Sequence, residues 1–314
     1  MRDEKKRGML NAERGSKNSS SFIVPRSSLA FVPPPSSLIP SCAIGCQGWN
    51  YDDWTTSAGG TSIFYPHGTR AAEMLAVYAR AFETVEVDST FYAIPPASTF
   101  ESWMKRTPDG FTFSLKLPQE MTHERALRSG SIELLEEFCE RARVLKEKLA
   151  SVLIQMPPQF ELTPENGRAL REFVPRLPRD IRFSIEFRSA DWLKQTVLDF
   201  LTEHNVALAL VEGQWISQED VWHLSEHPTA DFAYIRWMGA RNLTRFDTVQ
   251  RPQDENLQAW SKMIARLAER VPVVLAYFSN FYEGFAPASA NKLKRLLGQQ
   301  TVEAADLEDQ PSLF

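Results

Sequence analysis

The sequence is short of cysteine and histidine, and both shortages limit the chemistry it can carry. Its three cysteines, Cys42, Cys46 and Cys139, form no CxxC pair in a chain of 314 residues. A disulfide framework or a structural zinc site requires paired or clustered ligands of that kind. We therefore expect reduced thiols in a cytoplasmic protein, and five histidines leave little material for a metal centre.

Long hydrophobic runs and an excess of positive charge are also missing. No apolar stretch approaches the ~20 residues that span a bilayer, and the first residues show no apolar core or cleavage pattern of a secretory signal. The formal net charge is -5. An acidic body disfavours extensive contact with nucleic acid or with an anionic membrane.

Several motifs that mark common enzyme classes do not occur. No GxGxxG follows the first predicted strand, and the chain has no P-loop, GxSxG or HExxH. These absences disfavour dinucleotide binding, P-loop phosphate binding, nucleophile-elbow hydrolysis and zinc proteolysis. The sequence identifies no cofactor.

The most informative stretch that is present is TVEVDSTFYAIPP, residues 84–96. Val85 and Val87 alternate with Glu86 and Asp88, and this period of two predicts a strand with valines on one face and carboxylates on the other. The strand lies between helical patterns, so helices are expected to cover the valine face. The acids must then face an interior that can hold charge, such as the mouth of a (β/α)₈ barrel.

The rest of the chain alternates strands with helices in the same way. Strands are predicted within 43–49, 84–96, 111–118, 151–158, 181–188, 206–212, 232–239 and 272–280. Eight such units predict an α/β protein with a (β/α)₈ TIM-barrel fold. The rival fold is a doubly wound open sheet, which the missing GxGxxG disfavours.

The barrel is expected to form a single domain, residues 41–299, between two tails. Residues 1–40 are rich in serine and proline and are predicted to be disordered; the alternative is a basic arm that binds nucleic acid. Residues 300–314 are predicted to be an acidic, mobile tail.

Two helix starts can also be predicted. Ser98 and Glu101 have the spacing of a capping box. Thr163 followed by Pro164 is typical of an N-cap with proline at the first helical position.

A set of motifs occurring in order resembles the YecE-like family, domain of unknown function 72. The motifs are IGCQGW, TVEVDSTFY, WMKRTPDGFTF, THERAL, IQMPPQF, IEFRSADW, YIRWMG and AYFSNFYEGFAPASA. The resemblance runs from residue 44 to residue 297 and implies a TIM barrel, but no established reaction. Met238, Phe281 and Phe285 stand where many members have histidine. If those histidines serve a family chemistry, this chain has lost or altered it.

The alternation that turns Glu86 and Asp88 inward also turns polar residues of other strands toward the mouth. Close carboxylates raise one another's pKa and so create a proton donor, whereas guanidinium groups suit a carboxylate or phosphate on a substrate. The catalytic candidates are Glu86, Asp88, Lys116 and Glu186. The candidates for substrate binding are Trp49, Tyr92, Gln155, Arg188, Arg236 and Asn280.

Other interpretations of these residues stay open. The three acids and three cations could form a mutually neutralising ion-pair network. Lys116 could form a Schiff base or pair with a neighbouring glutamate. His123, which follows the third strand, could be a base, a metal ligand or neither.

The sequence predicts a barrel enzyme that uses carboxylate acid–base chemistry on a small polar substrate bearing a sugar or phosphate. One alternative is a DNA-repair or DNA-processing protein. Its terminal QPSLF resembles the peptide that binds the DNA sliding clamp, through Gln310, Leu313 and Phe314. A second alternative is a non-catalytic binding protein.

Overall fold

The computed structural model describes residues 42–55 and 62–308, and the predictions for residues 1–40 and for the QPSLF peptide lie outside this part. Its strands run parallel in the order β6-β5-β4-β3-β2-β1-β9-β8-β7. They are β1 Cys42–Gln47, β2 Thr84–Val87, β3 Thr112–Lys116, β4 Leu149–Gln155, β5 Phe183–Glu186, β6 Val206–Leu208, β7 Leu210–Glu212, β8 Phe232–Trp237 and β9 Val273–Phe278.

The sixth predicted strand, 206–212, is divided at Ala209 into β6 and β7. β6 pairs with β5 and β7 pairs with β8, so the two halves belong to opposite ends of the hydrogen-bonded sheet. Because the halves are consecutive in the chain, the nine strands form a nearly closed barrel. The predicted TIM-barrel fold is confirmed.

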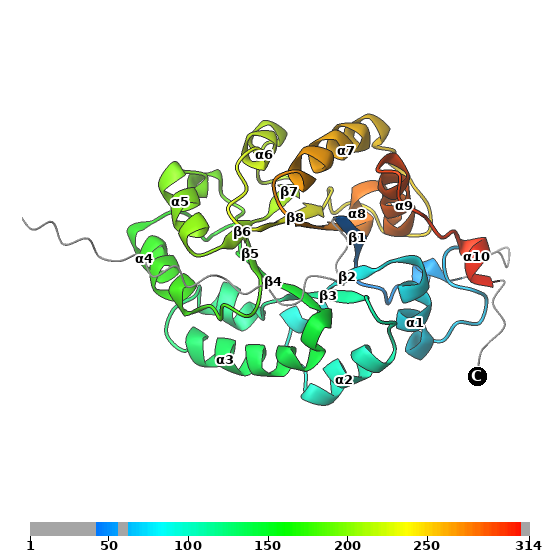
Figure 1. Ribbon diagram of the computed structural model, residues 1–314, viewed down its shortest axis with the longest axis horizontal. Helices are drawn as coiled ribbons and strands as arrows, with labels where there is room; N and C mark the ends of the chain where they lie inside the picture. Colours follow the sequence, from blue (N-terminus) through cyan, green and yellow to red (C-terminus); the bar gives the residue numbers. More distant parts are fainter. Residues whose placement is uncertain (1–41, 56–61, 309–314) are drawn as a thin grey trace, which may run out of the picture. The chain divides into compact units, whose positions relative to one another are not determined.

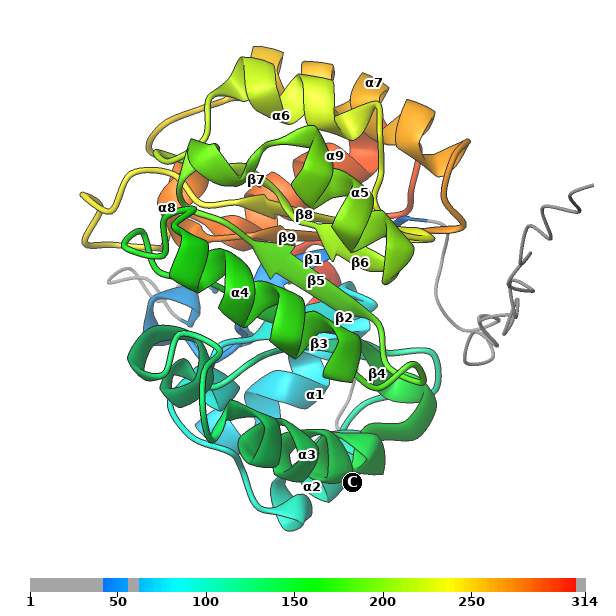
Figure 2. The same cartoon turned by 90° about the vertical axis from the view of Figure 1, so that its left-hand side faces the viewer.

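Helices surround these strands, as Figures 1 and 2 show. They are α1 Ala71–Ala81, α2 Ala97–Lys105, α3 Ser131–Ala142, α4 Pro164–Phe173, α5 Gln195–Glu203, α6 Gln218–Ser225, α7 Asp254–Ala268, α8 Asn280–Glu283, α9 Ala286–Leu296 and α10 Ala304–Glu308. The outward faces of the strands pack against them, through residues such as Val85, Val87, Leu115 and Ile185. The faces predicted from alternation are therefore observed.

The inward faces are apolar low in the barrel and charged at its mouth. A hydroxyl layer separates the two zones: Tyr277 Oη lies 2.8 Å from Thr84 Oγ1 and 2.7 Å from Ser114 Oγ. Ser114 Oγ in turn lies 2.9 Å from Ser151 Oγ. Two residues further along β2 and β3 stand Glu86 and Lys116. The charged residues thus rest on a layer that is already hydrogen-bonded.

The two predicted helix starts have different outcomes. Thr163 caps α4, because its side chain accepts a hydrogen bond from Asn166 N at 3.2 Å, and Pro164 is the first helical residue. The capping box at Ser98 is wrong. α2 begins at Ala97 after Pro96, and no side chain caps it. Pro96 occupies the N-cap position with an extended backbone, so Ser98 already lies inside the first helical turn.

Part of the predicted C-terminal tail is packed structure. α10 lies beside α1 (Figure 1), and Leu307 is buried. Arg80 Nη2 donates to Leu307 O at 3.0 Å. The packed part of the chain therefore extends beyond the predicted domain boundary at residue 299. The composition of this segment is polar, but burial of the single leucine Leu307 holds a short helix in place. In residues 42–55 and 62–308 no helix is both long and apolar enough to cross a membrane.

Candidate active site

Arg236 on β8 joins two buried carboxylates at the centre of the barrel mouth. Its Nε lies 2.9 Å from Glu86 Oε2 and its Nη2 lies 2.7 Å from Glu86 Oε1. Its Nη1 donates to Glu186 Oε2 on β5, and to Gln155 Oε1 on β4 at 3.0 Å. The Arg236 side chain is 1% exposed, so these contacts are shielded from water.

Two more residues complete this buried network. The Tyr234 hydroxyl, two residues before Arg236 on the same face, donates to Glu86 Oε2 at 2.8 Å. Arg188 Nε donates to Glu186 Oε1 at 2.8 Å. The order Glu86–Arg236–Glu186–Arg188 alternates negative and positive charge, which is how buried charges are tolerated.

The pKa values of the two carboxyl groups are shifted in opposite directions. Burial raises the pKa of Glu86, and the attraction of Arg236 only partly opposes that effect. Burial also works to raise the pKa of Glu186, but Arg236 and Arg188 together outweigh it and lower that pKa below its ordinary value. Since Arg236 is shared, the carboxyl group with the second guanidinium is the one whose pKa is lowered.

Asp88 and Lys116 form a second pair nearer the surface. Lys116 Nζ lies 3.1 Å from Asp88 Oδ1. The Asp88 side chain is 41% exposed, while that of Lys116 is 9% exposed. Lys116 Nζ also lies over the Phe91 ring, 4.6 Å from its centroid. The pair places a carboxylate where solvent or a ligand can reach it.

His123 stands in the short helical turn Glu120–Glu124 beside this pair. Its ring meets the edge of Phe91 at 5.0 Å, and its Nδ1 lies 2.9 Å from Thr122 Oγ1. Burial, followed by the positive charges of Arg188 and Lys116, lowers the pKa of His123 to about 4. His123 is therefore neutral at pH 7.

The metal-ligand alternative for His123 gains no support from the geometry. Within the described residues, no three His, Cys, Asp or Glu side chains are grouped so that they could hold a metal ion.

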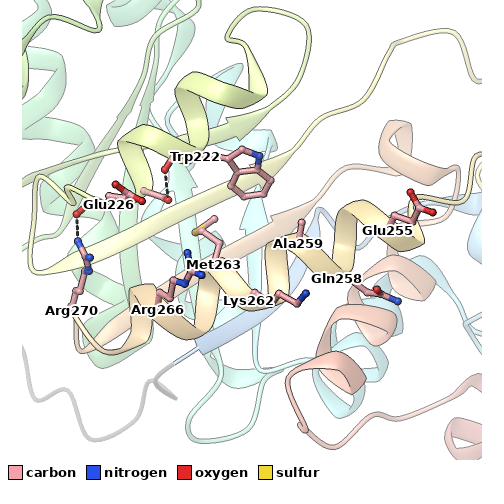
Figure 3. Close-up of a pocket in the computed structure, with 10 residues that line it drawn as sticks. Trp222, Glu226, Glu255, Gln258, Ala259, Lys262, Met263, Arg266 and Arg270 are labelled. Atoms are coloured by element: carbon pink, nitrogen blue, oxygen red, sulfur yellow. Dashed lines mark hydrogen bonds between the residues drawn. The ribbon is translucent and has the colours of Figure 1, made fainter.

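A cavity of about 100 Å³ opens beside the network. Its lining is Glu186, Arg188, Gln214, Trp215, Met238, Gly239 and Arg241. Met238, at the position where the family resemblance implies histidine, accepts a hydrogen bond from Gln47 Nε2 at its Sδ at 3.3 Å. Two larger hollows, each about 580 Å³, lie away from the mouth. One is formed by α6 and α7 (Figure 3), between Trp222 and Met263.

The remaining predicted substrate contacts lie outside the network. Trp49 packs edge-to-face against Trp103, with ring centroids 5.7 Å apart. Tyr92 is 72% exposed at the rim. Asn280 Oδ1 accepts from Trp54 Nε1 at 3.2 Å and from the backbone N of α9 at 3.0 Å, so its oxygen holds the scaffold together.

The two phenylalanines at other histidine positions of the family resemblance also pack against aromatic rings. Phe281 meets the edge of Phe246, and Phe285 meets the edge of Trp54.

Sequence reasoning missed the loop residues of the cavity, Gln214, Trp215 and Arg241. They directly follow β7 and β8, and loops at the carboxyl ends of barrel strands are where sites form. This rule indicates which loops form the site but not which of their residues. Strand alternation does not extend into loops, so it could not identify these three residues. It also missed that Tyr234 is a hydrogen-bond partner of Glu86.

A family model described as "Protein of unknown function DUF72" matches residues 43–312. The UPF0759 protein YunF of Bacillus subtilis (strain 168) is 28% identical over 278 residues, which are 81% of this chain and 94% of that protein. The UPF0759 protein YecE of Escherichia coli (strain K12) is 31% identical over 145 residues, 46% of this chain and 47% of its own length.

Solved structures agree with the fold. A DUF72 family protein from Thermotoga maritima has a TM-score of 0.67 at 23% identity, covering 82% of this chain and 99% of its own. One from Enterococcus faecalis has a TM-score of 0.65 at 19% identity, covering 87% and 99%.

Proposed function

Since this chain belongs to the DUF72 family of proteins of unknown function, we propose its activity from the barrel mouth: an enzyme that binds a small anionic substrate and moves a proton by acid–base catalysis. Arg188 is the anchor for the anion. Asp88 is the base, and Lys116 is its ion-pair partner. His123 is the second proton carrier.

This proposal rests on the unused hydrogen-bonding capacity of the Arg188 guanidinium. Its Nε is bound to Glu186, and among the described residues its two Nη atoms make no hydrogen bond. Arg188 lines the cavity of about 100 Å³. A planar guanidinium with two unused NH₂ groups binds a carboxylate or a phosphate well.

The buried acids support this site: Glu86 is not part of the cavity lining, and Glu186 lines the cavity with its two oxygens bound by Arg236 and Arg188. Glu86 has no exposed surface, and both of its oxygens accept hydrogen bonds from Arg236. We therefore assign Glu86 and Glu186 a positioning role. They neutralise Arg236 and fix the orientation of Arg188, so that the cavity presents a rigid cation.

The charges around His123 couple its protonation to the binding of an anion. Burial, followed by the positive charges of Arg188 and Lys116, holds the pKa of its imidazole low. An anion on Arg188 offsets that positive charge and moves the pKa of His123 back toward its ordinary value near 6.5. Binding therefore favours the protonated form of His123, which donates that proton to the substrate, while the exposed Asp88 carboxylate accepts one from the substrate.

A thermal-shift screen with phosphate, carboxylates and sugar phosphates tests the proposal. A ligand at 100 times its Kd adds about 2.7 kcal/mol and raises Tm by several degrees. Arg188→Gln should remove the shift, and Lys262→Gln, an exposed cation of the α6/α7 hollow, should keep it. NMR of each hit with protein in D₂O then detects product or hydrogen exchange.

Asp88→Asn should bind the same ligand without turnover. Binding by the wild-type protein with no reaction of any hit would show a non-catalytic binding protein. The absence of any anion-dependent shift would reject the anion site.

A further inference from the structure

A second cavity adjoins the one that contains Arg188. It measures about 300 Å³ and shares Gln214 and Gly239 with the smaller cavity. Ligand sites commonly span about 300–1,000 Å³. The cavity of about 100 Å³ alone fits a compact anion. The second cavity leaves room for the rest of a small molecule attached to that anion.

The loop wall between β8 and α7 is fixed. Arg251 Nη2 donates to Ala240 O at 3.0 Å and to Phe281 O at 2.8 Å, and its Nη1 donates to Asn242 Oδ1 at 2.9 Å. Gly239 has a φ of +63°, and a Cβ on it would lie 2.1 Å from Phe281 O. The boundary between the two cavities therefore requires glycine at position 239, and the Arg251 guanidinium fixes the adjoining backbone.

On the opposite wall, the charged residue Glu212 is hydrogen-bonded by other side chains of the protein. The Glu212 carboxylate accepts hydrogen bonds from Trp260 Nε1, Asn256 Nδ2 and, at 3.5 Å, the Tyr282 hydroxyl. These donors occupy both oxygens. Glu212 thus shapes the cavity, and its hydrogen-bonding capacity for a ligand is largely spent.

Two side-chain amides in the same cavity are unused. Neither Gln214 nor Gln253 makes a side-chain hydrogen bond to any described residue; the backbone N of Gln253 donates to Glu283 Oε1 at 2.8 Å, which fixes its main chain. An amide offers both a donor and an acceptor, and a hydroxyl group requires both. Neutral amides beside a charged anchor suit a ligand whose anion is followed by hydroxyls.

We infer that the substrate is a small polyhydroxylated anion, such as a sugar phosphate or sugar acid, whose hydroxyls bind Gln214 and Gln253 while its anion binds Arg188. Trp215, 41% exposed above the smaller cavity, offers a flat apolar surface to the carbon atoms of the ligand. This inference rests on the proposed function, since it takes the anion at Arg188 as given.

Calorimetry with paired ligands tests it. Inorganic phosphate is compared with ribose 5-phosphate, and acetate with gluconate. We expect the wild-type protein to bind the hydroxylated member of at least one pair tenfold or more tighter. The double variant Gln214→Ala/Gln253→Ala should lose that advantage and bind the simple anion within twofold of wild type. Gln258→Ala, a glutamine of the α6/α7 hollow (Figure 3), should behave as wild type.

The outcomes separate the two proposals. Equal binding of both members of each pair, or an advantage that survives in the double variant, overturns the inference and leaves the anion site intact. Failure of all four ligands to bind overturns the anion site and the inference together. Circular dichroism of each variant shows that its fold is retained.

Discussion

Arg236 forms ion pairs with two glutamates, Glu86 and Glu186, whose side chains are shielded from water. Its replacement by methionine keeps the volume and leaves Glu86 and Glu186 buried without their shared cation. Removing one partner of a buried ion pair costs about 3–5 kcal/mol. We expect Arg236→Met to lose about that much unfolding free energy at pH 7, measured by urea denaturation, whereas Lys262→Met at the surface should lose little.

The loss should depend on pH. A carboxyl whose pKa is higher in the folded than in the unfolded state stabilises the protein at low pH, and this contribution is lost as pH rises through the folded-state pKa. Burial already raises the pKa of Glu86, and without Arg236 the strongest opposing influence is lost. Arg236→Met should therefore be less destabilising at pH 5 than at pH 8. Adding Glu86→Gln should recover part of the stability; a pH-independent loss would contradict the charge argument.

His123 should titrate near pH 4, because burial, Arg188 and Lys116 disfavour its charged form. The unfolded chain has the ordinary value near 6.5. The stability linked to this residue is therefore complete above pH 6.5 and is lost as pH falls toward 4. NMR of the imidazole Cε1 proton in Arg188→Gln should show a higher pKa. His123→Gln identifies the resonance, and an unchanged pKa would show that Arg188 does not act on it.

At the scale of elements, two helix starts provide a matched comparison. Thr163→Ala removes the hydrogen bond to Asn166 N and should cost about 1 kcal/mol of unfolding free energy. Ser98→Ala should change it by less than about 0.5 kcal/mol, since Ser98 is exposed inside α2 and caps nothing. Equal losses in the two variants would show that the cap at Thr163 is unimportant.

Strand alternation predicted which face of the barrel each residue occupies, and the inward positions of Glu86, Lys116, Glu186 and Arg236 follow from it. Strand alternation did not predict how deeply each inward side chain is buried. Glu86 is sealed by Tyr234 and Arg236, while Asp88, two residues later, reaches the surface; strand alternation places both on the same face.

The break at Ala209 was also unpredictable. Ala207, Ala209 and Val211 all face inward, as in an unbroken strand. Neither glycine nor proline marks the change of pairing partner.

At the scale of the whole molecule, α10 belongs to the barrel domain. Leu307 is 1% exposed, whereas Leu296 on α9 is 42% exposed. We expect Leu307→Ala to lower the unfolding free energy by about 2 kcal/mol or more, as for other buried leucines, and Leu296→Ala to change it little. Thermal denaturation of both variants measures this. Equal midpoints would support the mobile tail that the sequence suggested.

The position of Arg236 in the chain has a consequence for synthesis. It lies 150 residues after Glu86 and 50 after Glu186. A ribosome releases the two acids first, and for that interval Glu86 has no guanidinium beside it and Glu186 has only Arg188. The first five strands must therefore wait, hydrated or protonated at these positions, until β8 emerges. The interior then becomes neutral in one step, which makes the last third of the chain the part that commits the molecule to its folded state.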